Sequence, residues 1–143
     1  MTMDKASRVM NGTFGQLWRE GEEIAELSAF QAKVAYTYDT VQMCGQVMED
    51  RKLVSAKGTG SMTLHKVYTR GADHMEKALR GIDVRDTLVG KLADPDAFGA
   101  ERVALYGVSY DEQTLLDFEA GKAGKTTVAF QFTGVKYLDR VEA

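Results

Sequence analysis

The stretch FQAKVAYTYD, residues 30–39, alternates in side-chain character with a period of two. One face of the extended chain would carry the apolar and aromatic residues Phe30, Ala32, Val34, Tyr36 and Tyr38. The other face would carry Gln31, Lys33, Ala35, Thr37 and Asp39. Such alternation over ten residues predicts a β-strand with one buried side and one polar side.

Several other segments show the same period and extend this prediction along the chain. Residues 13–18 and 22–27 are expected to form a hairpin around Arg19-Glu20-Gly21, and further strands are expected at 59–67, 83–92, 102–110, 114–118, 126–132 and 135–138. One amphipathic helix is expected at about 70–80, with Gly81 as its C-terminal stop. The sequence therefore predicts one mainly β domain over residues 1–143, a β-barrel or sandwich with one short α-helix packed on it.

The triplet Gly124-Lys125-Thr126 resembles the end of a phosphate-binding loop and needs a separate test. In such a loop the first glycine would lie at position 119, which is Glu119. The following residues, 126–132, alternate as a strand, whereas a phosphate-binding loop opens a helix. A turn between two strands is therefore the better interpretation, and a nucleotide-binding enzyme is disfavoured.

Composition narrows the possible functions further. The 143 residues carry a net charge of −3, which disfavours a general nucleic-acid-binding function, since such proteins present basic surfaces. The sequence contains no apolar run long enough for a membrane span, and its N-terminus lacks the apolar core of a signal peptide. The single cysteine, Cys44, excludes an internal disulfide and is typical of an intracellular product.

Residues that could perform catalysis or bind metal are sparse. His65 and His74 are the only histidines, and neither has a partner at metal-ligand spacing, so structural roles are expected for both. Seven carboxylates lie between Asp94 and Glu119, in a pattern that indicates a solvated acidic face or an electrostatic surface toward a partner. We therefore expect no enzyme activity, no cofactor and no metal.

Two segments depart from the strand pattern. Residues 1–11 show no clear period and are expected to be mobile or ordered by partners. Residues 42–57 form a long connection in which four apolar residues, Met43, Cys44, Val47 and Met48, precede a charged run at 49–52. Connections of this length within a compact domain are usually functional or disordered, and we interpret this one as an extended arm.

An ordered set of short motifs gives the chain a family resemblance. These motifs are Gly12, Gly21-Glu22-Glu23, Val41 with Met43-Cys44-Gly45, Gly58-Thr59-Gly60 before the strand 62–67, and the stretches 101–106, 117–122 and 128–132. Together they resemble the tail-tube proteins of contractile-tailed phages, in particular those of PBSX-like prophages of Gram-positive bacteria. The resemblance spans nearly the whole chain.

This resemblance implies a β-barrel-like fold shared with the inner-tube protein of type VI secretion. It implies homo-hexameric rings that stack into a hollow tube inside a contractile sheath, in a phage tail or a phage-tail-like bacteriocin. The implied partners are the chain itself, the tail sheath protein, and baseplate and tail-terminator proteins. DNA would pass through the lumen without specific binding if the particle carries it. The protein would be a virion component, made and assembled in the cytoplasm of the bacterial host.

The resemblance also gives the arm a role as the contact between subunits or rings. The residues expected at that interface are Met43, Cys44, Gly45, Val47, Met48, Arg51, Lys52, Leu53 and Lys57. An alternative from another functional class is a small soluble β-barrel that binds a ligand in its interior. That alternative leaves the exposed apolar arm unexplained.

Overall fold

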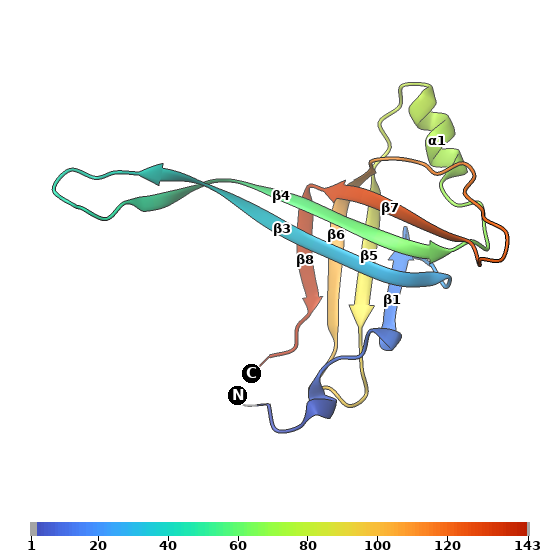
Figure 1. Cartoon of the computed structure of the whole chain (residues 1–143), viewed down its shortest axis with the longest axis horizontal. Coiled ribbons are helices and arrows are strands. Elements are labelled where there is room, and N and C mark those ends of the chain that lie inside the picture. Colours follow the sequence, from blue (N-terminus) through green and yellow to red (C-terminus); the bar gives the residue numbers. More distant parts are fainter. Residues whose placement is uncertain (1–2, 143) are drawn as a thin grey trace.

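The computed structural model describes residues 3–142 and contains an eight-stranded antiparallel sheet, strongly bent (Figure 1). The strands are β1 (Gly15–Arg19), β2 (Glu22–Glu23), β3 (Leu27–Val41), β4 (Asp50–His65), β5 (Asp86–Leu92), β6 (Glu101–Tyr110), β7 (Lys125–Phe132) and β8 (Gly134–Asp139). Their order is β2-β1-β5-β6-β7-β4-β3, and β8 also pairs with β6. The mainly β prediction is confirmed, as an open sandwich-like sheet that is not closed into a barrel.

The sheet bends because β6 belongs to both of its layers. The first half of β6 lies between β5 and β8, and its last two residues, Ser109 and Tyr110, pair with β7. The bend falls at Gly107, whose φ of 63° favours glycine, and the Thr133 N–H donates to the Tyr106 carbonyl there. In Figure 1, β3, β4 and β7 therefore run across the layer formed by β1, β5, β6 and β8.

The core fills the space between these two layers. Its fully buried members come from four strands: Leu17 of β1, Leu88 of β5, Leu105 and Val108 of β6, and Phe130 of β7. They are joined by Ile24, Met62, Leu64 and Phe132. Their period-two placement on each strand is the pattern seen in the sequence. Burial of these side chains is the main stabilisation of the body.

Two glycines of β4 allow the aromatic rings of β7 to enter the core. Gly58 is paired with Phe132 and Gly60 with Phe130. A Cβ atom at Gly58 would lie 2.4 Å from the Phe132 ring, and one at Gly60 would lie 2.4 Å from the Gln31 carbonyl oxygen. The Gly58-Thr59-Gly60 stretch thus has a packing role, since the rings occupy the space of the missing side chains.

Strands β3 and β4 form a hairpin that is much longer than the body needs. They pair from Leu27 with Leu64 to Val41 with Asp50, and a bulge interrupts the register between Thr37 and Tyr38. Beyond Val34 and Gly58 the hairpin leaves the body and projects into solvent (Figure 1). We call residues 35–57 the arm. The segment 42–57, expected from sequence to be a long connection, thus consists of a loop at 42–49 and the first half of β4.

Other sequence expectations have mixed outcomes. The hairpin at Arg19-Glu20-Gly21 is confirmed, with φ of 50° at Glu20 and 81° at Gly21, although its strands are shorter than expected. The strand expected at 114–118 is wrong, because residues 111–124 form an irregular loop whose apolar side chains are exposed. The alternation there has no neighbouring strand to pair with.

The expected helix is confirmed as α1 (Ala72–Leu79), but its packing on the sheet is slight. No residue of α1 is buried, and the His74 ring forms a T-shaped pair with the Tyr110 ring of the sheet, with ring centroids 5.2 Å apart. His74 also hydrogen-bonds the Val84 carbonyl at 3.0 Å. Among the described residues, no helix has the length and apolar character needed to cross a membrane.

The described part of the N-terminal segment is tied to the loop after β5. The Asn11 N–H donates to the buried Asp94 carboxylate at 2.8 Å, and Arg8 donates to the Asp96 carbonyl at 3.0 Å. The Arg8 guanidinium also lies over the Phe98 ring. Met1 and Thr2 lie outside the described residues, and the mobility expected for 1–11 stays a prediction.

Candidate assembly surface

The arm exposes an apolar face that continues the core-facing side of the body. Directly paired residues share a face of a hairpin, so Tyr36 with Ala56 and Tyr38 with Leu53 extend the face that carries Phe30 and Val34. In the body this face is covered by the second layer, but in the arm no described residue covers it. Tyr36 is 63% exposed and Leu53 is 52% exposed.

The burial expected for one whole side of residues 30–39 is therefore wrong for its distal half. Phe30 and Val34 pack against the core, whereas Tyr36 and Tyr38 do not. The opposite face of the arm is polar, with Lys52 paired with Asp39 and Ser55 with Thr37. The arm is thus amphipathic, although it has solvent on both sides.

The tip of the arm collects five of the residues expected at the interface. Met43, Cys44, Gly45, Val47 and Met48 all lie in the loop 42–49, which turns at Gly45 with φ of 81°. Val47 is 99% exposed and Met48 is 83% exposed. The loop is held by the Gln42 side-chain amide, which donates to the Gln46 carbonyl at 2.8 Å.

The remaining expected residues lie along β4. Arg51, Lys52 and Leu53 are in the distal part of the arm, where the Arg51 guanidinium lies 4.2 Å from the centre of the Tyr38 ring. Lys57 lies apart from them, at the base of the arm. Sequence reasoning missed Tyr36 and Tyr38 as surface residues, because their β-strand pattern was taken to mean burial within the same chain. Val54, also exposed, lies in the segment expected to be the arm but was not among the residues expected at the interface.

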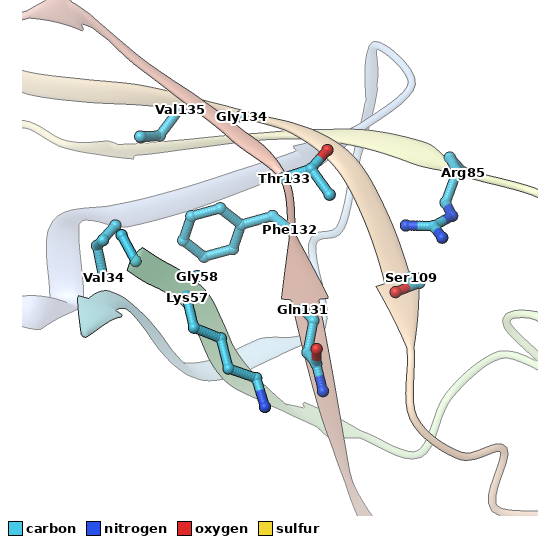
Figure 2. A pocket seen from close by; sticks show the side chains of 11 residues that line it. Val34, Lys57, Gly58, Arg85, Ser109, Gln131, Phe132, Thr133, Gly134 and Val135 are labelled. Atoms are coloured by element: carbon cyan, nitrogen blue, oxygen red, sulfur yellow. The ribbon is translucent and has the colours of Figure 1, made fainter. Parts of the chain in front are cut away.

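A hollow of about 590 Å³ opens where β4 separates from the junction of β7 and β8 (Figure 2). We call it the arm-base hollow. Val34, Phe132 and Val135 give it an apolar wall, and Lys57, Ser109, Gln131 and Arg85 add polar and basic groups. Arg85 is paired with Asp83 at 2.9 Å, whereas Lys57 forms no ion pair with any described residue.

Besides the two-residue strand β2, two longer strands have an open edge in the part of the chain that the structure describes. β3 pairs only with β4, and β8 pairs only with β6, so each presents one row of backbone N–H and C=O groups without a strand partner. Open edges of this length invite pairing with another chain. Together with the arm, they give the molecule the properties of an assembly subunit.

The opposite end of the sandwich is fixed by buried ion pairs. Glu26, 8% exposed, accepts two hydrogen bonds from the Arg70 guanidinium, and these bonds hold the pKa of that carboxyl below its usual value. Asp86, also buried, accepts from Arg19 at 2.7 Å and from the Tyr110 hydroxyl at 2.9 Å. Burial and the neighbouring Asp86 raise the pKa of Tyr110. These groups are satisfied by one another and have a structural role.

Comparison with known proteins gives this surface its context. The sequence profile of the family described as "Phage tail tube protein" matches residues 2–139. The chain belongs to the phage tail tube protein family. It is 32% identical over 131 residues to the phage-like element PBSX protein XkdM of Bacillus subtilis strain 168, covering 90% of this chain and 89% of that protein. The uncharacterised protein YqbM of the same strain matches with the same identity and coverage.

Solved structures with the same fold come from contractile and phage-like particles. A chain in the anti-feeding prophage tube-terminating cap aligns with a TM-score of 0.69 and 7% identity, over 98% of this chain and 95% of that one. A chain in the sheath–tube complex of an extracellular contractile injection system in its extended state gives 0.67 and 8%, over 96% and 98%. A chain in a gene transfer agent virion gives 0.54 and 13%, over 92% and 100%. At these identities the likeness establishes the fold alone.

Family membership makes this chain a tail tube subunit, a structural component of phage tails and phage-like particles. The Gly124-Lys125-Thr126 stretch fits this assignment, because it begins β7 and pairs through Lys125 with His65 of β4. Among the described residues, no group of three or more His, Cys, Asp or Glu side chains is placed to hold a metal ion.

Proposed function

We propose that this tail tube subunit closes into homo-hexameric rings, that the rings stack into a hollow tube, and that the arm forms the contact between subunits or rings. The observation that carries the proposal is the arm itself. Its apolar face, with Tyr36, Tyr38 and Leu53, is exposed in the single chain. Two-stranded hairpins are marginal in water, so an ordered arm of this length gains stability when a partner covers it.

The interface assigned to the arm has an apolar tip and a mixed stem. Val47 and Met48 at the tip would pack against the neighbouring copy. Burial of each side chain there would stabilise the contact by on the order of 1–2 kcal/mol, because apolar surface is removed from water. Arg51 and Lys52 on the stem would add polar contacts at the rim, where they favour orientation over affinity. The complete set assigned to this interface is Met43, Cys44, Gly45, Val47, Met48, Arg51, Lys52, Leu53 and Lys57.

The tube is proposed to lie inside a contractile sheath and to end on baseplate and terminator proteins. Support comes from the structural neighbours, which belong to a sheath–tube complex, a baseplate and tube-terminating assemblies. The net charge of −3 suits a conduit, because like charge prevents the phosphate contacts that cause non-specific DNA binding. Assembly in the bacterial host cytoplasm and a non-enzymatic role belong to the same proposal.

The paired register of the arm allows a precise deletion. Replacing residues 36–56 with Asn-Gly joins Ala35 to Lys57, which are already paired, through a two-residue turn that suits an antiparallel hairpin. We expect this variant to fold as a monomer and to form no tubes. Negative-stain electron microscopy and light scattering measure tube formation, and circular dichroism measures the fold.

The matched control keeps the arm and changes only its polar face, with Thr37→Ser and Ser55→Thr. This control should form tubes at the wild-type concentration. Tubes of normal width and length from the arm deletion would refute the role of the arm.

A further inference from the structure

The loop 111–124, between β6 and β7, has an exposed apolar segment with acidic neighbours. Leu115, Leu116 and Phe118 are 69%, 81% and 85% exposed. Four carboxylates accompany them, against one base within the loop, Lys122, which is paired with Glu119 at 3.2 Å. The segment thus combines exposed apolar side chains with a net negative charge.

This loop is held in place at its beginning. The Asp111 N–H donates to the Ala129 carbonyl at 2.9 Å, and the Gln113 side chain donates to the Arg70 carbonyl at 2.9 Å. Residues 115–119 follow directly from this anchor and project beyond it without a buried side chain. An apolar segment presented from a fixed base loses little conformational freedom when it binds, which favours association.

The arm-base hollow has the complementary chemistry. Val34, Phe132 and Val135 offer an apolar wall of a size that admits a leucine or phenylalanine side chain. Lys57 and Arg85 lie at its margin, and the Lys57 ammonium has no carboxylate partner among the described residues (Figure 2). An apolar segment with a carboxylate next to it therefore fits both parts of the hollow.

The two features lie at opposite ends of the same strand. The loop joins β7 at Lys125, and the hollow contains Phe132, the last residue of β7. Eight residues of strand span about 25 Å. In Figure 1 the loop passes beside α1 at one end of the sandwich, and the arm leaves from the other. A contact between loop and hollow is therefore head-to-tail between two copies, an arrangement that gives either closed rings or extended filaments.

We propose that residues 115–119 of one copy dock in the arm-base hollow of the neighbouring copy, with Leu116 or Phe118 against Phe132 and Asp117 near Lys57. The occupant is a second copy of this chain, because the charges of loop and hollow are opposite and their positions exclude a contact within one copy. This inference rests on the proposed self-assembly. It assigns to Lys57, at the base of the arm, a specific partner on the neighbouring copy, through a hollow that the rest of the arm interface does not include.

Site-directed cross-linking tests the contact in assembled protein. Cys44→Ser removes the native thiol, and two chains on this background carry either Lys57→Cys or Asp117→Cys. After the two chains are mixed and assembled, a short bis-maleimide should produce a covalent dimer. Lys77→Cys on α1, in place of Asp117→Cys, is the matched exposed control and should give no dimer. Tubes that assemble without the 57–117 dimer would overturn the docking while leaving the tube function intact.

Charge reversal gives a second test that does not depend on cysteine variants. Lys57→Glu and Asp117→Lys should each lower the yield of tubes roughly tenfold or more, because each places like charges in contact. The double variant should restore the yield, because residues 57 and 117 then again carry opposite charges. Lys77→Glu should have no effect. A double variant no better than either single one would overturn the contact. Parent protein that never assembles would instead refute the proposed function and this inference with it.

Discussion

The two halves of β3 follow the same sequence rule and reach opposite environments. In the body, Phe30 stacks on Phe130 with ring centroids 5.8 Å apart. In the arm, Tyr36 and Tyr38 occupy the same face of the same strand and remain 63% and 40% exposed. The alternation determines which face is apolar, but only the elements that cross it determine whether that face is buried. For the arm, those elements must come from another molecule.

A substitution in the core is expected to lower the unfolding free energy of the single chain more than any other substitution considered below. Phe130→Ala removes a ring that is 1% exposed and leaves a cavity between β7 and β3. We expect the free energy of unfolding to fall by about 3–5 kcal/mol. Urea unfolding of monomeric protein measures it. A loss below about 1 kcal/mol would mean that the body is no more tightly packed than the arm.

A smaller loss of unfolding free energy is expected at the β4 glycines, which lie against the rings of Phe130 and Phe132. Gly60→Ala places a methyl group against the Gln31 carbonyl oxygen and the Phe130 ring, which should cost about 1–3 kcal/mol of unfolding free energy. Gly12→Ala is the matched control, because a Cβ there meets nothing within 4 Å. Urea unfolding of both variants should separate them. Equal stability of the two variants would contradict the packing role of the β4 glycines.

The sequence predicted the body better than the arm, for a physical reason. In strands such as 126–132, apolar and polar side chains alternate because one side of the strand packs on the core. This alternation is visible in the sequence. Residues 50–57 carry no continuous alternation, because the bulge between the pairs Thr37–Ser55 and Tyr38–Leu53 places two apolar residues, Leu53 and Val54, in succession. This strand was therefore taken for a connection. Conversely, Thr114–Phe118 alternates without any neighbouring strand, and its apolar residues are exposed.

The candidate assembly surface was found only in part, for the same reason. The apolar tip residues Val47 and Met48 stood out because they lie in a long connection that breaks the strand pattern. Tyr36 and Tyr38 did not, because a strand face that is covered by another subunit has the same sequence pattern as one buried within its own chain. The arm-base hollow depends on where β4, β7 and β8 separate, which is a property of the three-dimensional arrangement.

The buried ion pair at the far end of the sandwich should make body stability depend on pH. Glu26 has a lowered pKa in the folded protein, because Arg70 donates hydrogen bonds to its charged form. The stabilisation is therefore present above the unfolded pKa of about 4.5 and is lost as the pH falls through the lower folded value. Glu26→Gln should cost about 1–2 kcal/mol at neutral pH, since its amide still accepts one hydrogen bond.

The pH profile separates this ion pair from ordinary loss of packing. Unfolding free energies measured from pH 7 down to pH 3 should converge for wild type and Glu26→Gln as the carboxyl becomes protonated. The exposed pair Asp83–Arg85 supplies the control, because Asp83→Asn should shift stability little at any pH. A gap that stays constant down to pH 3 would exclude the Glu26 charge as its cause.

The smallest effect on the single chain is expected in the arm, and there it is the most informative. Tyr36→Ser removes an aromatic ring that is 63% exposed, so monomer stability should change by less than about 0.5 kcal/mol. Tube formation should nevertheless need a higher protein concentration, because the lost ring no longer buries apolar surface against a neighbour. Light scattering against concentration measures this threshold. An unfolding cost near that of Phe130→Ala, with an unchanged threshold, would mean that the arm packs on its own body, which would contradict the proposed assembly role.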